Sequence, residues 1–261
     1  MKKKNWIILG LFIVPGVVFA AGKKDARIQE NPPVELHLYA GAGLRIPAEK
    51  IIKNFEESTG HTVSVEWAGM GQLLTRFRTT GAGDVFLSGS EFYVDEIKKD
   101  GKTTYDARLV YHTAVIGVRK DKADGINTIE DLAKSNLTLA AGDPQAIALG
   151  ISGEAIMDAS GFGEALRKKI VVRATSGPQL SMYLLNGDVD AAIIGRSDAV
   201  KNLDKLVLLP LPPGSPQEIA AIAALAVSEH PAVARQLAEW FAKPESIAIF
   251  VEEGYLPLDA E

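Results

Sequence analysis

Apolar residues recur along the chain with two alternating periods. In residues 34–40, VELHLYA, apolar and polar side chains alternate, which predicts a strand with one buried face. In residues 47–60, PAEKIIKNFEESTG, apolar side chains recur three and four positions apart, which predicts a helix. Pro47 stands in its first turn and Gly60 just past its end, where these residues are common in helices.

The same alternation continues to the end of the chain. Further strands are expected at residues 61–67, 84–89, 108–120, 137–144, 169–175, 188–195 and 205–212, with an apolar run at 219–229. Further helices are expected at residues 71–81, 91–101, 128–134, 145–161, 177–187, 231–245 and 246–254. The helix at 128–134 starts with Thr128 as its cap and Asp131 three residues on. Strands that alternate with helices predict an α/β fold of mainly parallel sheets covered on both faces.

Composition and charge narrow the classes of function. The chain has 261 residues, which fits two domains of about 100–150 residues each. Its net charge is −5 and it has no basic patch, so we exclude a nucleic-acid partner. It has no cysteine, so neither disulfides nor a lipid on an N-terminal cysteine is available, and the apolar core must stabilise the fold.

The first 21 residues have the layout of a secretory signal peptide. Basic residues Lys2 to Lys4 precede an apolar run from Trp6 to Phe19, and two alanines follow. The alternative is a membrane anchor, but a span needs roughly 20 apolar residues. This run is shorter and contains a Pro-Gly pair. We predict a periplasmic protein with a signal peptide at 1–21 and a mobile polar leader at 22–33.

Five predicted strand ends carry glycine. Ligands of α/β folds bind outside the carboxyl ends of strands, and helix N-termini there present unpaired N–H groups and a partial positive charge. Glycine lets an anion approach such backbone closely. The sequence therefore predicts one shared, backbone-lined anion site made of five loops: residues 40–43, 68–71, 88–90, 142–147 and 195–197.

Signatures of catalysis and of metal binding are missing from the sequence. GAGLRI at 41–46 lacks the third glycine of a dinucleotide fingerprint, and no Gly-Lys-Ser/Thr follows. No Gly-x-Ser-x-Gly elbow occurs, and the hydroxyls of Ser88 and Ser90 have no assignable His and acid partners. The scattered histidines lack metal-ligand spacing and are interpreted as surface or core residues: His37, His61, His112 and His230. We predict no enzyme, no cofactor and no metal site.

A site made of N–H groups suits an anion that carries no proton. A protonated phosphate brings its own O–H and needs an acceptor, usually a carboxylate. Asp84 precedes its strand and Asp143 is followed by a proline, so neither is interpreted as that acceptor. Molybdate, tungstate and sulfate need only donors, and the sequence favours an ion of this kind.

The chain resembles the periplasmic molybdate-binding proteins of ABC transporters, over roughly residues 34–258. The resemblance is carried by LYAGAGLR, FEESTGHTVSVEWAGMGQL, GAGDVFLSGSEFYVDEIKKDG, LAAGDPQAIALGISGEAI, NGDVDAAIIGRSDAV and FVEEGYLPL, in this order. It implies the two-lobed type II periplasmic-binding-protein fold, with crossover strands and hinge closure over the ligand. Lobe one would be residues 34–112 plus 209–261, and lobe two residues 113–208.

The resemblance also implies a monomer that delivers its ligand to an ABC permease in the inner membrane. The other class considered is an enzyme on the same fold, such as the porphyrin-pathway deaminase. That enzyme attaches its cofactor through a cysteine, which this chain lacks.

The resemblance places ligand contacts on particular residues. The family's first-loop serine corresponds to Gly43, its second-loop serine to Met70, beside Gly71, and its fifth-loop tyrosine to Gly195. Three hydroxyl donors are therefore replaced in this chain.

Backbone contacts of the family are expected at Gly89 and at the N–H of Ile147. Arg45 and Arg196 stand close to the loops in sequence and could supply charge-assisted donors. Two ligand classes remain open: a tetrahedral oxyanion, molybdate or tungstate first, and another small anion, sulfate-like or an organic carboxylate, clamped by arginine.

Overall fold

The computed structural model describes residues 32–215 and 217–258. The predicted signal peptide and nearly all of the predicted leader lie outside the described residues. The strands are β1 (Glu35–Gly41), β2 (Thr62–Ala68), β3 (Val85–Ser88), β4 (Thr103–His112), β5 (Ala114–Arg119), β6 (Leu139–Gly142), β7 (Ile170–Ala174), β8 (Ala191–Gly195), β9 (Leu206–Leu209), β10 (Glu218–Leu225) and β11 (Leu256–Pro257).

All but two of the helices follow the predicted periodic segments. The helices are α1 (Arg45–Thr59), α2 (Met70–Thr80), α3 (Glu91–Lys99), α4 (Ile129–Lys134), α5 (Ala148–Ala159), α6 (Gly163–Arg167), α7 (Gly177–Asn186), α8 (Arg196–Val200), α9 (Pro231–Phe241) and α10 (Pro244–Glu252), with 3-10 turns at Ala42–Leu44 and Lys120–Lys122. The capping box predicted for α4 is present: Thr128 Oγ1 accepts from the N–H of Asp131, and the Asp131 carboxylate accepts from the N–H of Thr128.

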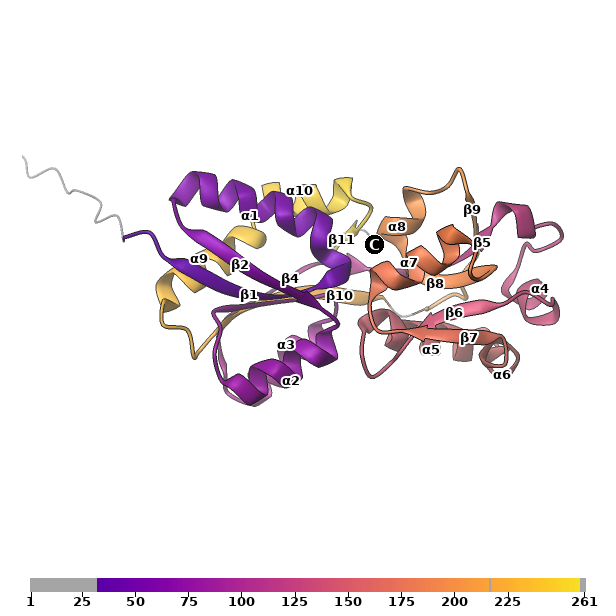
Figure 1. The fold of residues 1–261 in the computed structure, drawn as a ribbon, viewed down its shortest axis with the longest axis horizontal. Helices are drawn as coiled ribbons and strands as arrows, with labels where there is room; N and C mark the ends of the chain where they lie inside the picture. Colours follow the sequence, from indigo (N-terminus) through magenta and orange to yellow (C-terminus); the bar gives the residue numbers. More distant parts are fainter. Residues whose placement is uncertain (1–31, 216, 259–261) are drawn as a thin grey trace, which may run out of the picture. The chain divides into compact units, whose positions relative to one another are not determined.

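The first lobe is built on a sheet with strand order β11-β4-β10-β3-β1-β2. Helices α1, α9 and α10 cover one face of this sheet, and α2 and α3 cover the other (Figure 1). Fully buried phenylalanines fill both layers, with Phe55 and Phe250 on one face and Phe77 on the other.

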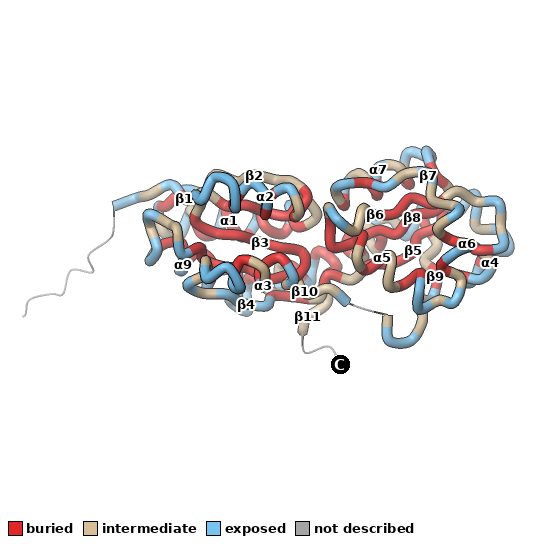
Figure 2. Tube along the Cα trace, turned by 90° about the horizontal axis from the view of Figure 1, so that it is seen from below, coloured by how far each residue is buried: buried red, intermediate tan, exposed pale blue. Residues whose placement is uncertain are grey.

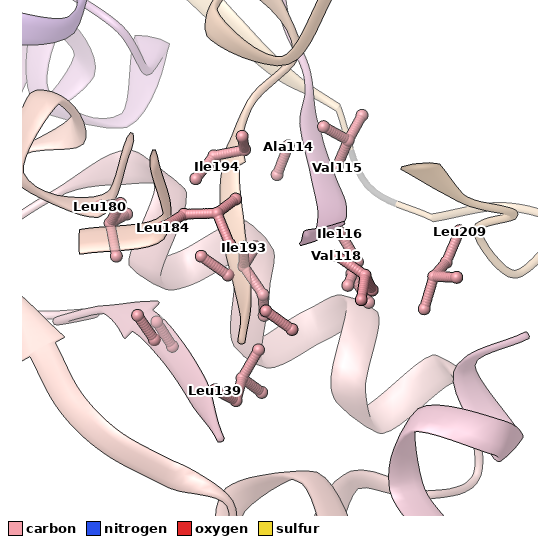
Figure 3. Close-up of a cluster of buried hydrophobic side chains, with 14 of the residues drawn as sticks. Ala114, Val115, Ile116, Val118, Leu139, Leu180, Leu184, Ile193, Ile194 and Leu209 are labelled. Atoms are coloured by element: carbon pink, nitrogen blue, oxygen red, sulfur yellow. The ribbon is translucent and has the colours of Figure 1, made fainter. Parts of the chain in front are cut away.

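The second lobe is built on a sheet with strand order β7-β6-β8-β5-β9. Its core is made of aliphatic side chains from the sheet and from α7, among them Ile116, Ile193, Leu180 and Leu184 (Figure 3). In both lobes the central strands are buried along most of their length (Figure 2). The two-lobed α/β fold expected from the sequence is therefore present.

Both sheets are mixed rather than mainly parallel. The expected parallel pairing holds for β1 with β2 and β3, and for β6 with β7 and β8. The chain passes from the first sheet to the second between β4 and β5, and returns between β9 and β10. The strands that follow these passages, β5 and β10, pair antiparallel with their neighbours. The long strand predicted at 108–120 accordingly divides at Thr113, with β4 in one sheet and β5 in the other.

Two short helices, α6 and α8, were not predicted. Each spans five residues, which is too short to show a helical period in the sequence. None of the helices within the described ranges is long and apolar enough to cross a bilayer.

Candidate functional site

A small cavity lies between the two lobes. Its volume is about 30 Å³, the scale of a water molecule or a small inorganic ion, and well below that of pockets for drug-sized ligands. Both lobes line it, through Gly41, Ala42, Gly43, Leu44, Ala68, Gly69, Met70, Gly89, His112, Ile147, Ala148, Leu149, Ser176 and Gly177.

Four helices begin at this cavity. They are α1, with the 3-10 turn that leads into it, α2, α5 and α7, and none of them has a side-chain hydrogen bond at its N-cap: Leu44, Gly69, Ile147 and Ser176. By contrast, α3 is capped by the hydroxyl of Ser90, which accepts from the N–H of Phe92. First-turn N–H groups have no acceptor within their own helix, so the four starts give the cavity a positive electrostatic potential.

The cavity contains no Asp, Glu, Lys or Arg among its lining residues. Its side chains are apolar apart from Ser176 and His112. Elsewhere in the described ranges, no group of three or more His, Asp or Glu side chains is placed to hold a metal ion. The arrangement can therefore hold a small anion by oriented dipoles, without a fixed cationic side chain.

His112 is the titratable side chain of the cavity. It ends β4 and is only 6% exposed. Its Nδ1 lies 3.0 Å from the carbonyl oxygen of Gly89, and its ring stacks on that of Tyr255 at 5.6 Å. A carbonyl only accepts, so Nδ1 carries a hydrogen. Burial lowers the pKa of His112, which favours the neutral ring.

The neighbours of His112 leave the ring little freedom. A Cβ on Gly89 would lie 2.8 Å from His112 Nδ1, so only glycine allows this approach. The Tyr255 hydroxyl donates to the carbonyl of Gly43 at 2.7 Å, and burial raises the pKa of Tyr255, so this donor keeps its proton. The orientation of the His112 ring is thus fixed from both sides.

Four of the residues predicted for the site line the cavity: Gly43, Met70, Gly89 and Ile147. The N–H of Ile147 donates to the carbonyl of Asp143 at 3.0 Å, so the open donors at this helix start belong to the residues after it, Ala148 and Leu149. Gly195 stands just behind the lining, where a Cβ would lie 3.7 Å from His112 Nε2.

The other three predicted residues are engaged elsewhere. Gly71 donates its N–H to the carbonyl of Ala146 in the other lobe at 3.1 Å. Arg45 pairs with Glu49 at 2.9 Å and lies over the Trp67 ring.

Arg196 donates to the carbonyl of Gly254 at 2.6 Å. Neither its guanidinium group nor that of Arg45 lines the cavity.

Two parts of the cavity lining were not predicted from the sequence. The loop after β7 brings Ser176 and Gly177 to the cavity, although Ser-Gly-Pro after a predicted strand was a usable helix-start signal. His112 had no local signal, because only the pairing of β4 with β10 and the fold of the loop at Gly89 bring it to the cavity.

Close backbone contacts join the lobes beside the cavity. A Cβ on Gly69 would lie 2.5 Å from the carbonyl oxygen of Thr175, and one on Gly71 would lie 2.5 Å from that of Gln145. Distances below 3.0 Å require a shift of backbone, so the Gly-Met-Gly sequence is what allows the lobes to meet here.

We predict that Gly71→Ala keeps the lobes apart. Alanine suits the first turn of α2, so the lobe itself stays folded, while the clash with Gln145 costs about 1–3 kcal/mol on closure. A ligand held by both lobes should bind roughly 5- to 150-fold more weakly, and X-ray scattering should show a larger radius of gyration. Gly153→Ala, whose new methyl meets only the Ile193 side chain within one lobe, is the control. Unchanged scattering in Gly71→Ala would contradict the prediction.

A buried carboxylate also links the lobes. Glu253, after α10, accepts hydrogen bonds from Lys50 of α1 and from Lys201 after α8. Its side chain is 11% exposed, and hydrogen bonds from Lys201 and Lys50 lower its pKa below the usual 4.5.

Glu253→Gln should therefore destabilise the protein in a pH-dependent way. A lowered folded-state pKa means that the stabilisation is complete above the ordinary pKa and is lost as the pH falls through the folded-state value. We expect Glu253→Gln to lower the free energy of unfolding by about 1–2 kcal/mol at neutral pH. The two proteins should converge as the pH falls below the usual 4.5 and through the lowered folded-state pKa of Glu253. Urea denaturation across this range measures it, with Glu252→Gln as control; a difference that persists in acid would refute it.

Comparison with known proteins identifies relatives of the whole described chain. The profile of the family described as bacterial extracellular solute-binding protein matches residues 36–256. A protein of Haemophilus influenzae described as a binding protein is 47% identical over 223 residues, which are 85% of this chain and 91% of that protein. The molybdate-binding protein ModA of Mycobacterium bovis is 22% identical over 254 residues, 95% of each chain.

The same fold occurs in a solved structure, that of the sulfate-binding protein SubI from Mycobacterium tuberculosis. It matches with a TM-score of 0.75 and 18% identity, covering 87% of this chain and 88% of that one. The resemblance seen in the sequence motifs is thereby confirmed for the family and for the fold.

Proposed function

Because this chain belongs to the bacterial extracellular solute-binding protein family, we propose that it captures a tetrahedral oxyanion for an ABC importer. Molybdate or tungstate is the first candidate, and the ion would be held between the two lobes and delivered to a permease in the inner membrane. The relatives support this choice of ligand class, since one binds molybdate and one binds sulfate.

The observation that carries the proposal is the convergence of four helix N-termini on one small cavity. Their first-turn N–H groups have no side-chain caps, and no carboxylate lines the cavity to balance their partial positive charge. The N–H of Gly71 is bonded to Ala146, and Pro178 in α7 has no N–H, so a small anion would take the first-turn donors that remain open in both lobes. The cavity volume of about 30 Å³ favours a compact inorganic ion over an extended organic one.

The alternative of a carboxylate clamped by arginine finds less support. Arg45 is paired with Glu49, and Arg196 is bonded to the backbone of Gly254. Either clamp would first have to break these contacts and bring a guanidinium into an apolar cavity. A sulfate-like ion held by backbone donors stays the second candidate.

The contacts between the lobes would couple ligand binding to closure of the protein. An anion in the cavity adds hydrogen bonds to both lobes, so it favours the closed arrangement by its differential affinity for that state. The closed pair, with α2 against the loop at Gln145, would be the form that the permease recognises.

Calorimetric titration with molybdate, tungstate, sulfate and chromate tests the ligand class. We expect heat and a thermal shift with at least one of these ions, because a ligand at 100 times its Kd stabilises the folded state by about 2.7 kcal/mol. Absence of both signals with all four ions would reject the proposal.

A proline at the start of α5 tests the role of the backbone. Ala148 is the first residue of α5, and Ile147 before it is extended, with φ −141° and ψ 149°, so Ala148→Pro fits the helix but removes one N–H. Loss of one hydrogen bond to a charged group corresponds to about 1.5–3 kcal/mol, or roughly 10- to 150-fold weaker binding. Ala148→Gly keeps the N–H and is the control, and equal affinity of the two variants would contradict a backbone donor at this position.

A further inference from the structure

His112 Nε2 reaches the anion cavity as a hydrogen-bond acceptor in a site otherwise made of donors. We infer that anion capture is coupled to one proton, which lies between His112 Nε2 and an oxygen of the bound anion. This inference rests on the proposed function and concerns the same cavity.

The tautomer of His112 follows from its surroundings. Nδ1 faces the carbonyl of Gly89 at 3.0 Å and must donate to it. The ring packs between Gly89 and Tyr255: its Nδ1 lies 2.8 Å from where a Cβ on Gly89 would stand, and its plane stacks on the Tyr255 ring. In the neutral ring, Nε2 therefore carries a lone pair and no hydrogen.

Nε2 lies close to one glycine of each lobe. A Cβ on Gly43 of the first lobe would lie 3.9 Å from it, and a Cβ on Gly195 of the second would lie 3.7 Å from it. Among the described residues, the side-chain hydrogen bond of His112 is made by Nδ1, and His112 lines the cavity. No buried side-chain nitrogen or oxygen of these residues lacks a partner, so an unpartnered Nε2 is one that the cavity leaves accessible. An anion held by the four helix starts is thus within reach of this nitrogen.

A lone pair facing an oxyanion oxygen is repulsive unless a proton lies between them. For a fully deprotonated ion, such as molybdate or sulfate, the neutral imidazole must take one proton from solution, and the new imidazolium N–H donates to the anion. For an anion with its own hydroxyl, such as hydrogen phosphate, the ligand O–H donates to Nε2 and no proton is taken up. The charge balance differs by one proton between these two ligand classes.

The groups around His112 support a ring that is neutral when the cavity is empty and protonated with a dianion. Burial disfavours the imidazolium, and the carboxylates of Glu218 on β10 and Asp198 on α8 favour it. Tyr255 stacks on the ring and stays uncharged, and the loop at Gly89 brings no charge. A dianion beside Nε2 adds the further negative charge that raises the pKa of the ring.

His112 also supplies a hydrogen-bond acceptor for a protonated ligand, which the sequence analysis did not identify. The five predicted loops offer no carboxylate that could accept a hydrogen bond from a ligand O–H, and for this reason the sequence favours ions without a proton. Nε2 is such an acceptor, so at neutral pH this site admits protonated oxyanions alongside dianions. Selection between the two classes is then set by pH rather than by a fixed charge.

The test is titration calorimetry of the mature protein with molybdate, sulfate and phosphate in two buffers of different ionisation enthalpy. For molybdate and sulfate we expect uptake of about one proton per ion at pH 7 and a roughly tenfold loss of affinity per pH unit towards pH 8.5. Phosphate should bind as the hydrogen phosphate with markedly less uptake. His112→Gln places a non-titrating amide there, and its molybdate affinity should not depend on pH, while His37→Gln outside the cavity keeps the wild-type behaviour.

The outcomes separate the inference from the proposed function. Binding of molybdate or sulfate without proton uptake and with flat pH dependence overturns the role of His112 and leaves anion capture intact. No binding of any ion rejects the proposed function itself. If His112→Gln does not fold, as checked by circular dichroism, the proton count on the wild-type protein decides alone.

Discussion

Four helix N-termini of the same polarity meet in one cavity, and no carboxylate lines that cavity to neutralise them. Their partial positive charges repel one another, so this closed arrangement calls for an anion. Glycine makes the approach possible, since at Gly69 and Gly71 any side chain would meet the backbone of the opposite lobe. The shape of the cavity, the contact between the lobes and the negative charge of the proposed ligand all follow from this one constraint.

The segment after α10, residues 253–255, also stabilises this arrangement of the lobes. Tyr255 holds the carbonyl of Gly43 and stacks on His112, and Glu253 bridges lysines from both lobes. Arg196 reaches the backbone of Gly254 across the same junction. Arg196, which its place in the sequence suggested as a ligand contact, thus ties the two lobes together.

Much of this could be predicted from sequence. The periods of two and of three to four placed the longer strands and helices, and glycine at strand ends marked four loops whose residues line the cavity. The direction of β5 and β10 could not be predicted in this way, because strand polarity depends on which sheet a strand enters. The direction in which Arg45 and Arg196 point depends on partners such as Glu49 and Gly254, which local patterns do not reveal. His112 was interpreted as a surface or core residue; it is buried, and it also faces the cavity.

We propose that backbone N–H groups, together with His112, hold the ligand. A crystal structure of the molybdate complex, with the metal located by its anomalous scattering, tests this most directly. We expect molybdate oxygens about 2.7–3.2 Å from first-turn nitrogens of both lobes and from His112 Nε2. A molybdate ion held by the guanidinium of Arg45 or Arg196, or bound away from the four helix starts, would contradict it.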